Sequence, residues 1–517
     1  MSARVDSINN LITVHRLVQL VVRAQLDTTE RDETQRLAQL ILASANPGEP
    51  DKAQNWPRLA ELSPHILPSG LIHTEDTEAR RVVLDQIRYR WTRGDYQSSK
   101  ELGEQTEKVW SSRWGDDDEL LLIARRDLAN AMRSLGEYQQ ARALAEDTLN
   151  RTRRVFGDDH EHTLYTADSL SWDHRISGNF REAMRIDEDN FARCHRVLGD
   201  DDPFTLKVAN NLAIDRRWLG DFEGARRADD DSVQRRRRVY GDEDQNTQLA
   251  VGSLARDLYE LGEYAEGLRL QEAALPIQRR ILGHVHGEVL VETRNQVILL
   301  RKAGQRARAR NLAEELFQTH KRRFGIEHEH TLAAMLSYGN ALRDTGELGA
   351  ARKIGEEALA NYRDLFGENH AATLSAANNL AITLRHLGEA DTALELNEAT
   401  LSRFRRVLGD DHPFTLCCAT NTSNDLAVLL RQDNARELSE DTLTHSRRVR
   451  GDDHPYTFAC MLNAALDRQA AGDAEGAAAL LGQAIAGFER RLGRRHPETV
   501  AASAHRRADC DLEPPGT

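Results

Sequence analysis

The stretches GDDDPFTLKVANNLAIDRRWLG at Gly199–Gly220 and DFEGARRADDDSVQRRRRVYG at Asp221–Gly241 span one unit of a repeat. The first glycine of this unit recurs every 42 residues, ten times, with no insertion anywhere in the series. A fixed period between about 20 and 50 residues indicates a solenoid, since each unit stacks on its neighbours and an insertion would break the stacking. The ten glycines are Gly115, Gly157, Gly199, Gly241, Gly283, Gly325, Gly367, Gly409, Gly451 and Gly493.

A second glycine column lies 21 residues after the first and divides each unit into two predicted helices. In the quoted unit these helices are Thr205–Leu219 and Phe222–Tyr240, and each ends on a glycine, the usual residue at a left-handed helix end. The second column is broken only at Leu430. The sequence therefore predicts an all-α chain in which residues 74–496 form ten helical hairpins.

Small side chains predict where the helices approach each other most closely. The position five residues after the second glycine is small in every unit, which indicates a close helix contact there. The residues in this column are Ser99, Ala141, Ala183, Ala225, Gly267, Ala309, Ala351, Ala393, Ala435 and Ala477.

The opposite face of the first helices carries two polar columns. Asparagine side chains can pair with the main chain of an extended peptide, and arginine can hold a carboxylate with two hydrogen bonds. We predict that these columns form a peptide-binding concave face, with pairing to Asp and Glu neighbours inside the groove as the alternative. The candidate site residues are Asn211, Asn295, Asn379, Asn421 and Asn463 in one column and Arg133, Arg175, Arg217, Arg301, Arg343 and Arg385 in the other.

Composition narrows the class of partner. The net charge of −14 disfavours simple attraction to nucleic acid or to an anionic membrane. Met1–Asn10 carries no signal-peptide pattern, and no apolar run approaches the roughly 18 residues of a membrane span. The five cysteines include no C-x-x-C pair, which favours a reducing compartment without structural disulfides. We expect a cytoplasmic protein that binds proteins or peptides and no membrane.

The junction histidines and acidic loops are interpreted as structural. Equivalent residues of successive hairpins lie about 10 Å or more apart, whereas the ligands of one metal ion lie about 2 Å from it. The D-D-H loops lack the ligand spacing of an EF-hand, and no residue set has the G-x-S-x-G context of a hydrolase nucleophile. We expect no enzyme activity, cofactor or metal. The junction histidines are His160, His286, His328, His370, His412, His454 and His496.

These columns resemble the tetratricopeptide repeat, in the 42-residue form found in kinesin light chains. The runs Asn210–Ala213 and Asn378–Ala381 match its N-N-L-A segment, and the G-D-D-H-P junction at Gly409–Pro413 is similar to its own. The resemblance covers Glu75 to about Cys510. It implies a right-handed superhelical solenoid whose first helices line a concave groove that binds extended peptides of partner proteins.

Residues 1–73 lie outside the period. We expect a short strand at Leu11–Val14 and helices at His15–Leu26, near Glu33–Ala45 and at Trp56–Leu67. The H-R-L-V-Q run at His15 and the segment Trp56–Gly70 resemble the end of the winged helix and the linker of NB-ARC NTPases. This resemblance implies a small helical, winged-helix-like remnant.

The same segment, taken with the repeats, resembles the tetratricopeptide protein of FxSxx-COOH peptide-modification gene clusters. That resemblance implies a precursor peptide with a free C-terminal carboxylate as ligand. The alternative that it implies is the sensor arm of a signalling or transcriptional regulator, with residues 1–73 docking on a nucleotide-binding partner protein. No G-x-x-x-x-G-K-[ST] motif occurs in the chain, so ATP binding is not expected.

The C-terminal end is predicted in two parts. A lone helix at Pro497–Cys510 should cap the last hairpin, and residues 511–517 should form a disordered tail.

Overall fold

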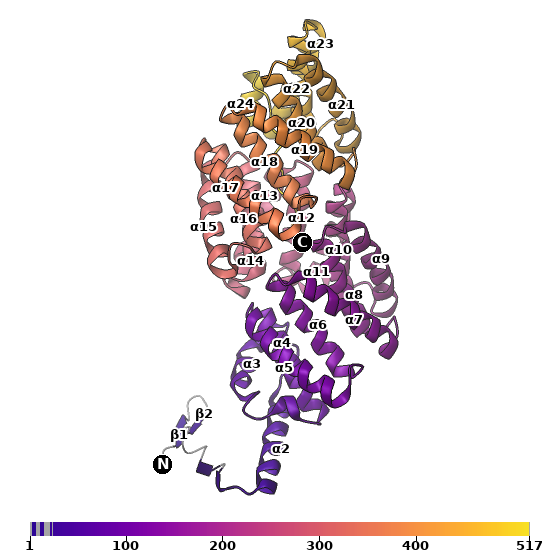
Figure 1. Ribbon diagram of the computed structural model, residues 1–517, viewed down its shortest axis with the longest axis vertical. Coiled ribbons are helices and arrows are strands. Elements are labelled where there is room, and N and C mark those ends of the chain that lie inside the picture. The colour runs from indigo at the N-terminus through magenta and orange to yellow at the C-terminus, as the bar shows by residue number, and fades with distance from the viewer. Residues whose placement is uncertain (1–2, 7–10, 15–20, 23, 516–517) are drawn as a thin grey trace. The chain divides into compact units, whose positions relative to one another are not determined.

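The computed structural model describes residues 3–6, 11–14, 21–22 and 24–515 (Figure 1). The chain divides into two compact units, Met1–Asp158 and Asp159–Thr517. Apart from two short strands, the regular structure of the described residues is helical, which confirms the all-α class. Within the same residues, no helix combines the length and the apolarity needed to cross a bilayer.

In the N-terminal part of the first unit, the described residues form two strands and two α-helices. Strands β1 (Ala3–Asp6) and β2 (Leu11–Val14) pair antiparallel, and helix α2 (Thr28–Ala45) starts with a capping box at Asp27. Helix α3 (Trp56–Leu62) ends earlier than expected, because Pro64 lacks the N–H that a continuing helix requires. The short 3₁₀ helices of this region are Ala53–Asn55, Ser63–His65 and Leu71–His73.

The strand at Leu11–Val14 and the helix at Glu33–Ala45 are thus confirmed, the helix with an earlier start. The helix expected at His15–Leu26 falls largely outside the described residues. The resemblance of residues 1–73 to an NB-ARC protein stays a prediction.

The described residues contain ten helical hairpins, at the positions that the 42-residue period predicts. They are α4 (Thr77–Thr92) with α5 (Tyr96–Trp114), α6 (Glu119–Ser134) with α7 (Tyr138–Phe156), α8 (Glu161–Ile176) with α9 (Phe180–Val197), α10 (Pro203–Trp218) with α11 (Phe222–Tyr240), α12 (Gln245–Glu260) with α13 (Tyr264–Leu282), α14 (Gly287–Lys302) with α15 (Arg306–Phe324), α16 (Glu329–Asp344) with α17 (Leu348–Phe366), α18 (Ala371–His386) with α19 (Ala390–Leu408), α20 (Pro413–Val428) with α21 (Gln432–Arg450), and α22 (Pro455–Ala470) with α23 (Ala474–Leu492).

The two glycine columns have different backbone conformations, which explains why only one of them is broken. Gly241, in the first column, has φ 86° and ψ 170°, a region that essentially only glycine adopts. Gly220, in the second column, closes a Schellman motif in which the next residue, Asp221, donates to the carbonyl of Arg216 at 2.8 Å. Leu430 takes the equivalent position with φ 59°, which other residues can adopt at a cost of about 1–2 kcal/mol.

The small-residue column lies where helices pack closely, as predicted. Its alanines are at most 4 % exposed. At Gly267 an added Cβ would lie 2.9 Å from the carbonyl oxygen of Ala255 and 2.8 Å from the side chain of Leu299. The contact there is too tight even for alanine.

The second unit coils on itself, because each of four junction histidines bonds to a helix end 194 residues earlier. In each case Nδ1 accepts the N–H two residues ahead and caps the following helix. Nε2 then donates to a carbonyl between four and five repeats back. These bonds join His370 to Ile176 (3.1 Å), His412 to Trp218 (3.0 Å), His454 to Glu260 (2.9 Å) and His496 to Lys302 (3.0 Å).

The contact between coils is close at the glycines of the second column as well. An added Cβ on Gly220 would lie 2.7 Å from Cδ of Pro413, and one on Gly262 would lie 2.3 Å from Cδ of Pro455. Phe180 stacks on Trp218 with ring centroids 4.4 Å apart, in a buried cluster that also contains Phe414. The H-P junctions therefore pack against the glycines of the second column, and these contacts hold successive coils of the second unit together.

Helix α24 (Pro497–Ser503) corrects the prediction for the C-terminal end. We expected a helix to Cys510, but a Schellman motif stops it: His505 takes φ 52°, and the N–H of Arg506 donates to the carbonyl of Ala501 at 3.0 Å. Residues 506–515 are not helical, and residues 510–515 are buried, so the expected disordered tail is also wrong for 511–515. Main-chain pairing outside the helix, described below, replaces the helical bonds.

Replacing Leu430 with glycine should stabilise the protein. The variant Leu430→Gly relieves the left-handed strain, and the greater freedom of unfolded glycine offsets only part of that gain, so the free energy of unfolding should rise by about 1 kcal/mol. Leu430 is 77 % exposed, so little packing is lost. Urea denaturation is the measurement, and Leu430→Ala, which keeps Cβ, is the matched control. Equal stabilities of the two variants would contradict the strain.

The histidine hydrogen bonds between successive coils should contribute less to stability in acid. Burial lowers the pKa of His370 and His412 to about 4 and that of His454 to about 3. The folded state keeps these rings neutral while the unfolded state takes up protons below about pH 6.5. Their contribution to stability is therefore complete above pH 6.5 and is lost as the pH falls towards 4.

The variant His412→Asn tests this contribution. Asparagine can still cap the helix but has no group to reach Trp218, so it should cost about 1–2 kcal/mol at pH 7 and reduce the loss of stability between pH 6.5 and 5. Thermal denaturation at several pH values is the measurement. The exposed His284, changed to Asn, is the control. An unchanged pH slope in His412→Asn would contradict the role of this ring.

Candidate functional site

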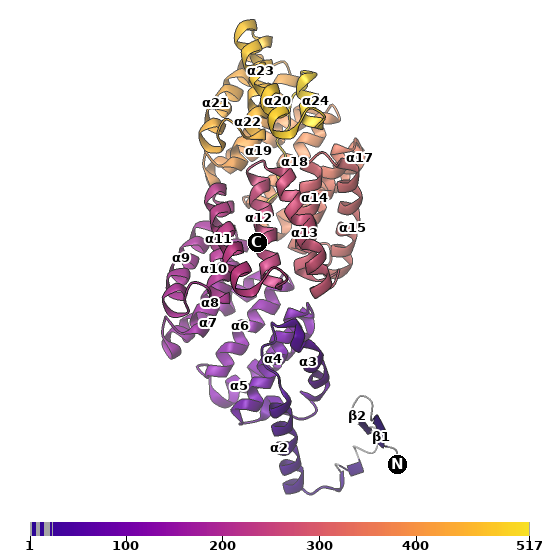
Figure 2. The same cartoon turned by 180° about the vertical axis from the view of Figure 1, so that it is seen from behind.

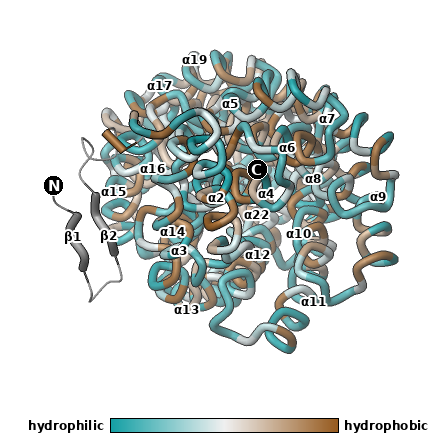
Figure 3. Tube along the Cα trace, turned by 90° about the horizontal axis from the view of Figure 1, so that it is seen from below, coloured by the Kyte–Doolittle hydropathy of each residue, from teal (hydrophilic) through white to brown (hydrophobic). Residues whose placement is uncertain are grey.

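The C-terminal tail, residues 504–515, runs from the surface into the interior of the second unit. Residues 503–506 are exposed, residues 507–509 are half-buried and residues 510–515 are buried. Figures 1 and 2 show the helices of the second unit, α8–α24, from opposite sides. Figure 3 shows hydrophilic (teal) and hydrophobic (brown) residues interspersed along these helices. The interior of this unit thus holds an extended segment of its own chain.

Three asparagines of the predicted column hold the main chain of this tail. They come from α18, α20 and α22 and are at most 4 % exposed. Each Nδ2 group donates to a tail carbonyl, and each Oδ1 accepts the N–H of the same tail residue. The pairs are Asn463 with Ala508 (2.9 and 2.9 Å), Asn421 with Cys510 (2.8 and 3.1 Å) and Asn379 with Leu512 (2.7 and 2.9 Å).

The spacing of the asparagines along the solenoid matches the spacing of the paired residues along the tail. One repeat of 42 residues in the solenoid corresponds to two residues of tail, and two residues of extended chain advance about 6.6–6.8 Å. The next position of the asparagine column is Ser337, and the next tail residue in register is Pro514, which has no N–H to donate. The series of main-chain pairs therefore ends where both partners change.

The tail residues between these pairs are acidic and meet cations. Side chains alternate along an extended segment, so Asp509, Asp511 and Glu513 project from the side opposite to the paired residues. The contacts are Asp509 with Arg385 (2.5 Å) and His386 (2.6 Å), Asp511 with Lys302 (2.6 Å), Arg343 (2.9 Å) and Arg301, and Glu513 with Arg294 (3.2 Å) and Arg301 (3.2 Å).

These contacts keep Asp509 and Asp511 of the tail ionised. Burial alone would raise the pKa of Asp511, but Arg301, Lys302 and Arg343 hold it well below its usual range. Asp509 behaves in the same way, and Arg385 and His386 lower its pKa. We call the surface that binds the tail the inner groove; it consists of Asn379, Asn421 and Asn463 with Arg301, Arg343 and Arg385 and the cations Arg294 and Lys302 beside them.

Family models match along most of the repeat region. One tetratricopeptide-repeat model matches residues 121–162, 163–204, 297–330, 331–372 and 373–414, and a second matches 204–280 and 420–490. The chain belongs to the tetratricopeptide-repeat family. The tetratricopeptide repeats predicted from the two glycine columns are thereby confirmed, and the chain is a repeat scaffold of a kind consistent with protein–protein interaction.

The chain is similar to several solved structures, each at low sequence identity. A Podosopora anserina protein described as a kinesin light chain with nearly identical TPR-like repeats is 22 % identical, with a TM-score of 0.32, over 39 % of this chain and 95 % of its own. BtubC (BKLC) from P. vanneervenii is 18 % identical, with a TM-score of 0.35, over 44 % and 92 %. A Rap protein complexed with competence and sporulation factor is 12 % identical, with a TM-score of 0.46, over 81 % and 100 %. No curated protein matches the sequence significantly.

The arginine column divides into two parts along the tetratricopeptide repeats. Arg175 bonds to Asp187 and Asp215, both at 2.8 Å, and is 2 % exposed. Arg217 donates to Asp229 at 2.6 Å and forms an ion pair with Asp257, also at 2.6 Å. For these two arginines the structure has the alternative, pairing with acidic neighbours inside the repeats. In the first unit, Arg133 donates to Asn130 at 2.8 Å.

The residue 40 positions after each arginine accounts for part of this difference. It is Asp215 for Arg175, Asp257 for Arg217 and Asp425 for Arg385, and each of these acids forms an ion pair with its arginine, although Arg385 also contacts the tail. It is Ala341 for Arg301 and Thr383 for Arg343, which offer no carboxylate. Arg301 reaches Asp344 instead, at 3.0 Å, whereas the ion pair of Arg343 in the described structure is with Asp511 of the tail.

Two asparagines of the predicted column lie away from the tail. Asn211 donates to Asp168 at 2.6 Å. Asn295 donates to Glu292 at 3.4 Å, and Gln271 bonds to the same carboxyl group at 2.9 Å. Burial raises the pKa of Glu292 to about 7, against the effect of these two amides. Both asparagines thus belong to contacts within the repeats.

Sequence reasoning missed several residues that contact the tail. Asn340 donates to Glu513 at 2.9 Å and Asn424 to the carbonyl of Ala508 at 2.8 Å. Arg294 also donates to the carbonyl of Pro514 at 3.1 Å. The alternating acids of the tail were a readable signal, because every second residue from Asp509 to Glu513 is acidic. Asn340 and Asn424 lie two periods apart in one column, but the intervening residue of that column is Ile382, so the column did not stand out as polar in the sequence.

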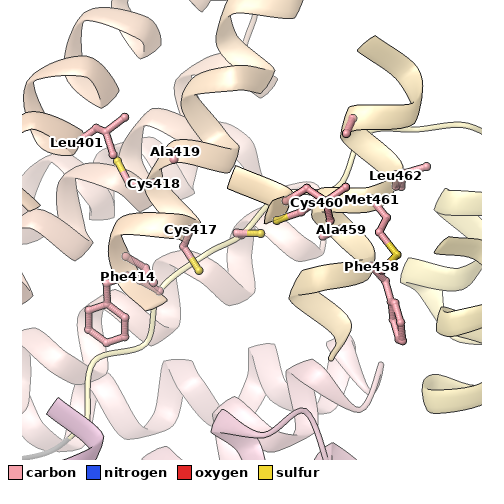
Figure 4. Packing of buried hydrophobic residues seen from close by; sticks show 14 of the residues in the cluster. Leu401, Phe414, Cys417, Cys418, Ala419, Phe458, Ala459, Cys460, Met461 and Leu462 are labelled. Atoms are coloured by element: carbon pink, nitrogen blue, oxygen red, sulfur yellow. The ribbon is translucent and has the colours of Figure 1, made fainter. Parts of the chain in front are cut away.

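The middle of the tail carries a thiol, that of Cys510, which lies near thiols of the solenoid. Cys510 belongs to a buried apolar cluster with Cys417 of α20 and Cys460 of α22, part of which is shown in Figure 4. Arg450 donates to Sγ of Cys417 at 3.3 Å. Burial opposes ionisation of this thiol, but its interactions with Cys510 and Arg450 lower the pKa of Cys417 to about 7.

The space beside the tail offers little room for a substrate. A cavity of about 30 Å³ lies next to Pro514 and Pro515, and it can hold about one or two water molecules. Arg294, His320 and His330 are among its lining residues. Burial lowers the pKa of His320 to about 3 and of His330 to about 4, so both rings are neutral. Within the described part of the chain, no three His, Cys, Asp or Glu side chains are placed to hold a metal ion.

Mild oxidation of the native chain with diamide should join Cys417 to Cys510. Two thiols lose two electrons and two protons to the reagent and form one disulfide, faster as the pH rises through 7 because the thiolate is the reactive form. Tryptic peptides analysed by mass spectrometry, with and without reduction, are the measurement. Buried Cys194 should stay a free thiol. Separate alkylation of Cys417 and Cys510 after oxidation would contradict the position of the tail.

Proposed function

We propose that this protein is a non-catalytic scaffold that recognises an extended segment of a partner protein in the inner groove. The observation that carries the proposal is the set of double hydrogen bonds from Asn379, Asn421 and Asn463 to an extended main chain. Because the groups that these side chains read are present in almost any sequence, the same pairs can form with a segment from another protein. The bound tail supports this function because it shows that the inner groove holds a segment in an extended conformation.

The proposal assigns different roles to the candidate residues. Peptide contact belongs to the inner-groove residues Asn379, Asn421, Asn463, Arg301, Arg343 and Arg385. Structural pairing within the repeats belongs to the others, namely Asn211, Asn295, Arg133, Arg175 and Arg217. Arg175 and Arg217 are buried and doubly paired, and an arginine already held by two carboxylates has little left to offer a ligand.

The biological setting is a proposal taken from sequence alone. The resemblance to FxSxx-COOH systems favours a precursor peptide, whose C-terminal carboxylate could meet a cation of the groove. The alternative is the sensor arm of a regulator whose NTPase is a separate partner. Comparing a carboxylate-ended peptide with its amidated form tests the first setting, because equal affinities would remove the carboxylate from recognition.

Main-chain reading can be tested with a modified peptide. The tail is cut after folding at a protease site placed in the exposed segment 503–506, and a labelled peptide with the sequence of residues 504–517 is titrated by fluorescence anisotropy. Methylation of the peptide nitrogens equivalent to residues 508, 510 and 512 removes three donors, and each should weaken binding by about tenfold. The unmethylated peptide should bind with a defined stoichiometry of one.

Matched asparagine variants complete the test. Asn379→Ala, Asn421→Ala and Asn463→Ala should each weaken the unmethylated peptide and lose sensitivity to methylation at the paired position. Asn211→Ala, from the same column but paired with Asp168, should leave affinity unchanged. Equal binding of methylated and unmethylated peptides would remove main-chain recognition, and with it the proposed function.

A further inference from the structure

We propose that the tail is an internal occupant of the inner groove, and that the partner taken in its place is an extended segment with acidic side chains at alternate positions. This inference rests on the proposed function and adds the chemistry of the ligand. It also adds a consequence: the chain in its resting state blocks its own binding surface.

Of the inner-groove cations on α14 and α16, Arg301 alone among the described residues pairs with a carboxylate of the solenoid, that of Asp344. Four cations, Arg294, Arg301, Lys302 and Arg343, lie there, and each is at most 8 % exposed. Within the described residues, Lys302 and Arg343 find a carboxylate within 4 Å only on Asp511, and Arg294 only on Glu513. Buried charges need partners, so this part of the groove is complete only with an acidic segment in it.

The repeats themselves indicate that the deficit is specific to the groove. Where the residue 40 positions after an arginine is aspartate, the solenoid supplies the carboxylate, as for Arg175 and Arg217. Where it is Thr383, the tail supplies the carboxylate of Arg343 instead, and where it is Ala341, the tail adds carboxylates to the Asp344 that pairs with Arg301. A second acidic residue, Asp509, joins Asp425 on Arg385. The missing acids of the repeats are thus replaced by acids of the ligand.

The main-chain pairs with the asparagines determine the spacing of the acidic residues that a ligand needs. Main-chain pairs at every second residue hold the segment extended, so the intervening side chains all face the same side, towards the cations. A segment with acids at three alternate positions satisfies both sets of contacts at once. One with adjacent acids would turn half of them towards Cys417 and Cys460, which are buried in an apolar cluster.

The tail can leave the groove from its exposed end. Residues 503–506 are exposed and follow the short helix α24, and Arg507 pairs with Asp467 at the entrance. As a covalently attached segment, the tail competes at an effective concentration on the order of millimolar. A partner with the same contacts is therefore excluded unless the tail is weakened or the partner adds contacts elsewhere.

The test weakens the tail without removing it. Asp509→Asn, Asp511→Asn and Glu513→Gln are combined in the full chain, which keeps the size of each side chain and every main-chain pair. The control combines Asp364→Asn, Asp433→Asn and Glu437→Gln, three exposed acids of the same unit. Two labelled peptides serve as probes: one has the sequence of residues 504–517, and the other carries amides in place of its three acids.

The triple tail variant should bind the acidic probe at least tenfold more tightly than the wild-type and control chains do, and at least tenfold more tightly than it binds the amide probe. Hydrogen exchange at the amides of Cys510 and Leu512 should be slow in the wild type and faster in the variant. Circular dichroism and thermal denaturation confirm that the variant is folded.

Each of the other outcomes would contradict one specific part of the proposal. Equal affinity of the variant for both probes would overturn the acidic ligand class and leave main-chain recognition standing. Equal affinity of wild type and variant for the acidic probe, or unchanged exchange protection, would overturn occupancy by the tail. Failure of the variant to bind either probe, with its tail amides exchanging freely, would overturn the proposed function itself. A wild-type dimer in sedimentation would assign the occupant to a second copy.

Discussion

The second unit depends on a neutral imidazole that bonds in two directions. Nδ1 of His412 caps α20, while Nε2 reaches the carbonyl of Trp218 in a coil formed 194 residues earlier. A protonated ring could not accept the N–H bond, so the contact requires an uncharged histidine. Because four such bonds recur at one spacing, an insertion in any intervening repeat would break a bond. The invariant 42-residue period is therefore a condition for the coil to close on itself.

Closure creates an interior in which charges must be balanced locally. Arg175 and Arg217 meet this requirement with aspartates of their own and neighbouring helices, and the corresponding space is closed. Arg301 and Arg343 have Ala341 and Thr383 at the equivalent positions; Arg301 pairs with Asp344 and with the C-terminal tail, and Arg343 pairs with the tail. One solenoid thus contains arginines balanced by its own acids and arginines balanced by the acids of the tail.

The periodic features were accessible from the sequence. The ten hairpins, the close contact at Gly267 and the structural role of the junction histidines follow from columns that a 42-residue alignment displays. The tail was not accessible in the same way: Pro497–Cys510 has local helical character, and the bonds that keep Ala508–Leu512 extended come from Asn379, Asn421 and Asn463, up to 133 residues away. Long-range pairing overrode local preference.

The sequence by itself determined the repeat, its hairpins and the polar character of the inner face, because these depend on residues that recur within one unit or between neighbours. Only the tertiary structure decided which arginines pair with acids of neighbouring helices and which pair with the tail. The partner of each arginine depends on which atoms the coiling of the solenoid brings together. The tertiary structure also decided that the chain's own end fills the groove. A single unit contains the chemistry of recognition, but the space in which it acts exists only after several units have closed around it.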